Sequence, residues 1–270
     1  MKYCWGDTMR CEVFLVISAM PLYKAFLVLF FSFVVSGCSS MTWKNAGDSF
    51  IRAAKEPMTW VNAGAAAVIY TAGKDQEISE KLSRDTPVFG SREGAQDYSD
   101  KFRSVTSISM NASALLVNDS ESDRKFLDKT YRVLGNNISA GFVATSTGDW
   151  QGIFERKRPD GEPGSMPSAH TSRAFACAYF ANKNYENSHL YSPVSSFMSF
   201  ITYTSAYLTG YARVEGKKHY PTDVFMGAAY GSFVPSFIYH FTDNFGLGNN
   251  VVVSFNKIGK YQSIEFVYLF

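Results

Sequence analysis

Apolar residues recur every three or four positions over most of the chain beyond residue 48, which is the spacing that places them on one face of an α-helix. Ser, Thr, Gly, Pro and Tyr interrupt these segments at intervals, which favours helices buried in a bundle over transmembrane spans. The sequence therefore predicts a mainly α protein. The predicted helical segments are 49–73, 107–117, 122–135, 137–147, 171–182, 192–214 and 221–241.

Proline and glycine divide the first helical segment. Pro57 removes a backbone donor inside 49–73, so two helices are expected to meet there at a kink, and Gly73 is expected to end the second. Residues 74–100 that follow are polar and rich in turn formers. We expect a surface excursion over this stretch.

Capping residues suggest the limits of a further helix. Ser120 and Asp123 are typical of a helix cap with an acidic first turn. Gly135 is typical of a helix end, because glycine adopts the left-handed conformation that closes many helices. The segments on either side of Gly135 are therefore predicted to be separate helices.

The C-terminal residues follow a different period. Apolar and polar residues alternate in 251–256 and again in 261–270, on either side of the turn-forming stretch 257–260. This alternation is the signature of two strands joined by a short loop. We predict a β-hairpin extension over residues 246–270.

The first forty residues have the character of a targeting segment. Lys24 precedes the apolar run 25–38, which ends in small residues, as secretory signal peptides do. The ending Val-Ser-Gly-Cys resembles a bacterial lipobox, in which Cys38 becomes the lipidated N-terminus of the mature protein. Residues 1–37 are thus predicted to be a lipoprotein signal peptide, and the absence of Asp at Ser39 favours the outer membrane over the inner membrane.

Two alternatives to this N-terminal prediction stay open. Residues 13–35 approach the length that spans a bilayer, so an uncleaved anchor is the competing interpretation. Met9 and Met20 are also possible start sites.

Composition narrows the class of protein. The chain has 270 residues, of which 46% are hydrophobic, and this suits one globular domain. A net charge of +2 without a long basic run excludes the electrostatic footprint of a nucleic-acid-binding protein. Beyond the predicted lipidation site only Cys177 remains, so no intramolecular disulfide forms there, and Cys177 is expected in the core.

Two short stretches carry the candidate chemistry. The first, RPDGEPGSMPSAH, places Arg158, Ser168 and His170 on a loop that leads into a helix, where guanidinium, hydroxyl and backbone donors suit an oxyanion. The second, ARVEGKKHYPTD, contributes an arginine, a histidine and an aspartate. His219 and Asp223 are four residues apart, so on a helix that begins nearby the carboxylate can fix and polarise the imidazole.

Together these stretches resemble the type 2 phosphatidic acid phosphatase (PAP2) superfamily, which also contains bacterial acid phosphatases and vanadium haloperoxidases. The family pattern is Lys-x6-Arg-Pro, then Pro-Ser-Gly-His, then Ser-Arg-x5-His-x3-Asp. The chain matches it in order and internal spacing from residue 158 onward, with PSAH at 167–170. The resemblance implies a single helical-bundle domain of the PAP2/haloperoxidase type, which we assign to residues 38–245.

The resemblance also implies roles for single residues. His219 would be the nucleophile that forms a phosphohistidine, Asp223 its orienting carboxylate, and His170 the general acid and base. Arg158, Ser168 and Arg213 would bind the phosphate. No metal and no cofactor is implied.

Two positions depart from the family pattern. The family glycine is Ala169, whose N–H still binds phosphate if its φ is negative. The family lysine is Gln151, which lacks the positive charge. If 152–157 are helical, Gln151 and Arg158 share a face two turns apart. Arg156 or Lys157 could supply the missing charge from the neighbouring turn.

The sequence thus predicts a metal-independent phosphatase in the periplasm, held to the membrane by its lipid anchor. It would hydrolyse a phosphomonoester or pyrophosphate group of a lipid or small molecule. Two other functions stay open: an envelope structural or binding protein that keeps the fold with a weakened site, and a vanadium-dependent haloperoxidase.

Overall fold

The computed structural model describes residues 17–18, 43–119, 125–244, 251–258 and 261–268. The predicted signal peptide, apart from residues 17–18, lies outside the described residues, as do Cys38 and the proposed cap at Ser120 and Asp123. These three predictions stay predictions.

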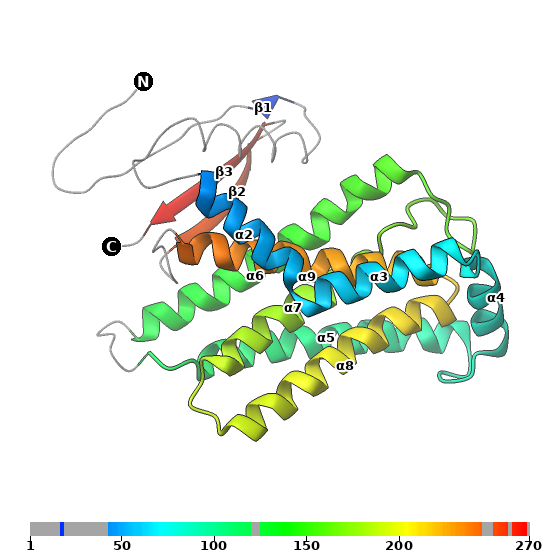
Figure 1. Cartoon of the computed structure of the whole chain (residues 1–270), viewed down its shortest axis with the longest axis horizontal. Helices are drawn as coiled ribbons and strands as arrows, with labels where there is room; N and C mark the ends of the chain where they lie inside the picture. The colour runs from blue at the N-terminus through cyan, green and yellow to red at the C-terminus, as the bar shows by residue number, and fades with distance from the viewer. Residues whose placement is uncertain (1–16, 19–42, 120–124, 245–250, 259–260, 269–270) are drawn as a thin grey trace.

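The described part of the chain is mainly α, as the periodicity predicts, and its helices form one bundle (Figure 1). Helix α7 is the central element, because it packs against α5, α6, α8 and α9. The helices are α2 (Trp43–Lys55), α3 (Pro57–Thr71), α4 (Asp75–Asp85), α5 (Arg92–Leu116), α6 (Lys125–Phe154), α7 (Ala169–Glu186), α8 (Ser192–Glu215) and α9 (Pro221–Asn244).

Close contact between α7 and α9 brings the two candidate stretches together. A Cβ atom at Gly227 of α9 would lie 2.7 Å from the carbonyl oxygen of Ser168, and one at Gly231 would lie 2.2 Å from that of Ser172. Only glycine fits where two backbones approach so closely. The two glycines thereby let the N-terminal half of α9 lie against the start of α7.

The core is built around the inward faces of α7. Phe175 and Tyr179 are fully buried, and alanines fill much of the remaining helix surface. Small side chains allow neighbouring helices to approach, while the aromatic rings bury large apolar areas. Cys177 is buried in this core, as predicted.

The chain breaks at Pro57 and Gly73 as predicted. Glu56 separates α2 from α3, Pro57 is the first residue of α3, and Gly73 has a φ of 63°. Residues 74–100 lie mostly at the surface, as predicted, but the expectation of turns is wrong, because α4 and the first part of α5 occupy most of the stretch. The inward positions of α4 are polar, which leaves no apolar period to read; they are Asp75, Ser79 and Ser83.

The predicted helix end at Gly135 is also wrong, since α6 continues through it to Phe154. Arg132, Asn136, Ala140 and Val143 form one continuous buried stripe across that glycine. Packing along this stripe outweighs the roughly 1 kcal/mol that glycine costs inside a helix.

Strands β2 (Val251–Ile258) and β3 (Tyr261–Tyr268) pair antiparallel, with Val251 opposite Tyr268. Strand β1 (Ile17–Ser18) pairs antiparallel with β3, so the order is β1-β3-β2. Among the helices that the structure describes, none combines the length and the apolar composition required to cross a bilayer.

Candidate active site

The site lies where the loop before α7, the C-terminal end of α8 and the first turn of α9 meet. The amide of Ser168 donates a hydrogen bond of 3.0 Å to the carbonyl oxygen of Asp223, which ties the two stretches directly. Arg213 is in the last turn of α8, and Lys218 and His219 are in the short connection to α9. The amides of both connecting residues donate to the carbonyl oxygen of Arg213.

His219 is buried and held by a backbone group. Its Nδ1 lies 2.7 Å from the carbonyl oxygen of Ser165. Because a carbonyl only accepts, Nδ1 carries the hydrogen and Nε2 carries the free lone pair. Burial, and then the charges of Arg213 and Arg158, lower the pKa of His219 well below its ordinary value. The imidazole is therefore neutral, with Nε2 as its basic atom.

Asp223 does not bond His219 directly, contrary to the expectation from their spacing. Its Oδ2 is 3.9 Å from Nδ1 of His219, beyond hydrogen-bonding distance. Instead, Oδ2 accepts from the Ser165 hydroxyl and from the amide of Tyr220. Ser165 thus stands between the two, with its hydroxyl on the carboxylate and its carbonyl on the imidazole. Asp223 is thus linked to His219 through Ser165, which sequence spacing could not reveal.

Arg156 contacts the other oxygen of Asp223, with Nη1 of its guanidinium 2.7 Å from Oδ1. The same guanidinium donates to Thr222 and to Asp75 of α4, and Asp75 also accepts from the amide of Thr222. Arg156 thus forms ion pairs with two carboxylates, and its charge is not available to replace the family lysine in binding phosphate. Lys157, the other proposed substitute, is exposed. The sequence did not predict these contacts of Asp75, because this residue lies in the segment interpreted as a surface excursion.

Arg213 is a buried cation without a full set of partners. The residue is only 7% exposed, and its Nε has no hydrogen-bond partner within the described structure. Burial, and then the charge of Arg158, lower the pKa of Arg213 to about 10. A buried guanidinium left in this state is costly unless an anion joins it. The arrangement is chemically suited to binding an anion.

Arg158 lies in the loop that faces Arg213. Its Nε donates to the carbonyl oxygen of Gly164, and its backbone amide donates to the backbone carbonyl oxygen of Glu162. Lys218 pairs with Asp160 of the same loop at 2.7 Å. This ion pair joins the loop to the connection that carries His219.

The start of α7 carries the remaining motif residues. Ser168 is fully buried at the N-cap of α7, and its hydroxyl accepts a hydrogen bond of 3.1 Å from Thr171. Ala169 is the first residue of α7 and is not among the described residues with positive φ, so replacing the family glycine causes no strain there. Burial, and then Arg213 and Arg103, lower the pKa of His170 to about 4.

Gln151 is not related to Arg158 by helical geometry, contrary to the expectation. Helix α6 ends at Phe154, and Glu155 adopts a left-handed φ of 48°. The Gln151 Nε2 instead donates at 2.8 Å to the carbonyl oxygen of Pro167, the residue before Ser168. Its amide therefore braces the loop that leads into α7.

Sequence reasoning missed two charged residues of α5. Asp100 and Arg103 both contribute to the electrostatic environment of His170 and Arg213. They belong to no motif, and only the packing of α5 against α7 and α8 brings them near the site. Over the residues that the structure describes, no group of three or more His, Cys, Asp or Glu side chains could hold a metal ion.

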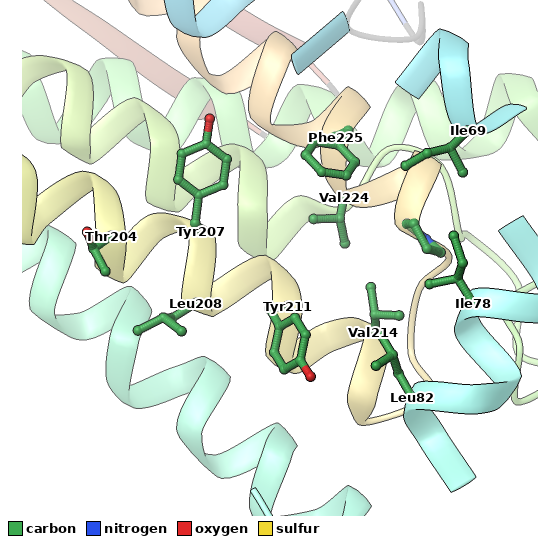
Figure 2. A pocket seen from close by; sticks show the side chains of 11 residues that line it. Ile69, Ile78, Leu82, Thr204, Tyr207, Leu208, Tyr211, Val214, Val224 and Phe225 are labelled. Atoms are coloured by element: carbon green, nitrogen blue, oxygen red, sulfur yellow. The ribbon is translucent and has the colours of Figure 1, made fainter. Parts of the chain in front are cut away.

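An apolar pocket of about 480 Å³ lies between α3, α4, α8 and α9 (Figure 2). None of the candidate site residues lines it, but Val214 and Val224 directly follow Arg213 and Asp223 in the chain. The pocket and the charged site therefore share the same ends of α8 and α9. The lining residues are Ile69, Ile78, Leu82, Thr204, Tyr207, Leu208, Tyr211, Val214, Pro221, Val224 and Phe225.

Parts of the chain are similar to known proteins. Lipid A 1-phosphatase of Porphyromonas gingivalis is 38% identical over 91 residues, which cover 33% of this chain and 19% of that protein. The matched part is thus about a fifth of that relative. The crystal structure of a transmembrane PAP2 type phosphatidylglycerolphosphate phosphatase from Bacillus subtilis aligns with a TM-score of 0.48 and 18% identity, covering 67% of this chain and 91% of that one. The PAP2 superfamily pattern matches residues 132–247, which include both candidate stretches.

Proposed function

We propose that the protein is a phosphatase that hydrolyses a phosphomonoester or pyrophosphate group without a metal, through a phosphohistidine on His219. The observation that carries this proposal is the state of His219. Its Nδ1 hydrogen is held by the Ser165 carbonyl, so the Nε2 lone pair is available beside Arg213 and Arg158. A neutral, oriented imidazole next to two guanidinium groups suits attack on a phosphoryl group.

The reaction would proceed in two steps. In the first, Nε2 of His219 bonds to phosphorus while the bond from phosphorus to the leaving oxygen breaks, and His170 gives a proton to that oxygen. In the second, His170 takes a proton from water, the water oxygen attacks the phosphohistidine, and inorganic phosphate leaves. Arg158, Arg213 and the Ser168 hydroxyl would hold the phosphoryl oxygens throughout.

We propose a phosphorylated lipid as the substrate. The relative from Porphyromonas gingivalis is by its name a lipid A 1-phosphatase. The apolar pocket beside the ends of α8 and α9 would suit a hydrocarbon chain, because its lining is almost entirely apolar. Lipid A, undecaprenyl pyrophosphate, phosphatidic acid and soluble phosphoesters all carry the group that these residues would bind.

A metal-free assay tests the proposed activity. The purified protein, in EDTA, is expected to release phosphate from p-nitrophenyl phosphate and from at least one of these lipids. Vanadate should inhibit the release of phosphate, because it mimics the transition state of phosphoryl transfer. Vanadate-dependent halide oxidation would instead indicate a haloperoxidase. Absence of both activities would favour the structural or binding protein.

The proposed location rests on the N-terminal sequence. We propose that residues 1–37 are removed, that Cys38 is lipidated and that residues 38–245 form a periplasmic phosphatase domain held at the outer membrane, followed by the extension 246–270. Cys38→Ser is expected to leave an unprocessed precursor without acyl label in cells fed labelled palmitate. Normal processing and labelling of that variant would disprove the lipid anchor.

A further inference from the structure

A carboxylate of α5 lies against the imidazole at the start of α7. Oδ1 of Asp100 is 3.2 Å from Nε2 of His170. The same oxygen accepts a hydrogen bond of 2.9 Å from Nη2 of Arg103, one turn further along α5. One carboxylate oxygen is therefore shared between an imidazole and a guanidinium.

This contact determines which nitrogen of His170 is free. A carboxylate only accepts, so Nε2 carries the hydrogen in the contact with Asp100. Nδ1 is then the atom left to exchange a proton with substrate or water. The guanidinium of Arg103 holds the carboxylate in place, which limits the orientations of the His170 ring.

The charges around His170 act in opposite directions. Arg213 of α8 and Arg103 of α5 both disfavour the imidazolium, as does burial. Asp100 favours it, both through its charge and through its hydrogen bond. A residue that donates a proton must first hold one, so a counter-charge at this position has a chemical purpose.

We propose that Asp100 is a positioning residue for His170: it holds Nε2–H, points Nδ1 toward the leaving oxygen, and stabilises the protonated ring that acts as general acid. Arg103 in turn fixes Asp100. This inference rests on the proposed function of His170 as the acid. It extends the catalytic machinery to α5, which contributes no residue to the three sequence motifs.

The two histidines of the site differ in the groups that contact their rings. His219 bonds a neutral carbonyl, and its nearest carboxylate is 3.9 Å away, so the ring stays neutral and nucleophilic. His170 contacts a carboxylate directly, which opposes the lowering of its pKa by burial and by Arg213 and Arg103. Paired groups whose environments differ in this way commonly divide nucleophile and acid between them.

Asp100→Asn tests the proposal through its dependence on the leaving group. An alkyl phosphate needs a proton on its leaving oxygen, whereas 2,4-dinitrophenyl phosphate does not. We expect kcat/KM of the variant to fall about 100-fold for the alkyl phosphate and less than about threefold for the dinitrophenyl ester. Asp100→Glu should recover much of the loss. Asp97→Asn, which removes an exposed carboxylate one turn earlier on α5, should change neither value.

The pH profile gives an independent readout. The acid must be protonated, so kcat/KM for the alkyl phosphate falls as pH rises through the pKa of His170. Removing the negative charge of Asp100 lowers that pKa, and the falling limb should therefore move to lower pH.

Equal losses on both substrates, or an unmoved limb, would overturn the inference. A wild-type protein that hydrolyses neither ester would instead count against the proposed function itself. The wild-type assay thus separates the two failures.

Discussion

His219→Ala is expected to abolish phosphatase turnover, lowering kcat by at least about 10⁴-fold, because the nucleophile itself is removed. The fold should persist, since the helices around the site pack through α7, α8 and α9 rather than through the imidazole. Initial rates with p-nitrophenyl phosphate measure the loss, and far-ultraviolet circular dichroism measures the helix content.

Rapid quenching with labelled substrate identifies the phosphorylated residue. In the wild type, acid-labile label is expected on His219, and His170→Ala should let it accumulate when the leaving group is activated. His189→Ala is the matched control, because His189 is exposed and outside the site. Label found on His170 instead would reverse the two roles.

Arg213→Met is expected to reduce activity strongly and yet stabilise the fold. Methionine retains much of the buried volume but cannot bind a phosphoryl oxygen. Two charge-assisted contacts at about 1.5 to 3 kcal/mol each correspond to a loss of at least about 100-fold in kcat/KM. Removing an unpaired buried charge should raise the melting temperature by about 2 to 4 °C, or about 1 kcal/mol.

Arg132 provides the matched control for this prediction. It is also buried, at 6% exposure against 7% for Arg213, but it is paired with Asp119 at 2.6 Å. Arg132→Met leaves Asp119 without its partner and should destabilise the fold by about 3 to 5 kcal/mol. Vanadate should raise the melting temperature of the wild type but not of Arg213→Met. If Arg213→Met destabilises the protein as Arg132→Met does, Arg213 is structural.

The sequence predicted those helices that bury apolar side chains and missed those that do not. Apolar residues recur with a clear helical period in the segments that form α7, α8 and α9. Helix α4 buries Asp75 because Thr222 and Arg156 satisfy its carboxylate, and those partners are far away in the chain. A buried polar face produces no apolar period in the sequence. Only the packed bundle therefore shows why these residues form a helix.

Helix limits depended on tertiary packing in the same way. Gly135 has the local character of a helix end, but the buried stripe on either side of it continues without interruption. Conversely, 152–157 could have continued α6, yet Glu155 turns the chain out of the helix. Because of that turn, Arg156 reaches the carboxylate of Asp223, and the side-chain amide of Gln151 donates to the carbonyl oxygen of Pro167.

The amino-acid sequence by itself determined which side chains form the candidate site, because Arg158, Ser168, His170, Arg213 and His219 occur in motifs with characteristic internal spacing. It also determined the mainly α class. Only the tertiary structure decided how each group is held and charged. The protonation state and tautomer of each group depend on the atoms that lie within a few ångströms of it, and those atoms come from distant parts of the chain. The Ser165 carbonyl contacts His219, and the Asp100 carboxylate contacts His170. The buried Arg213 has no partner for its Nε among the described residues.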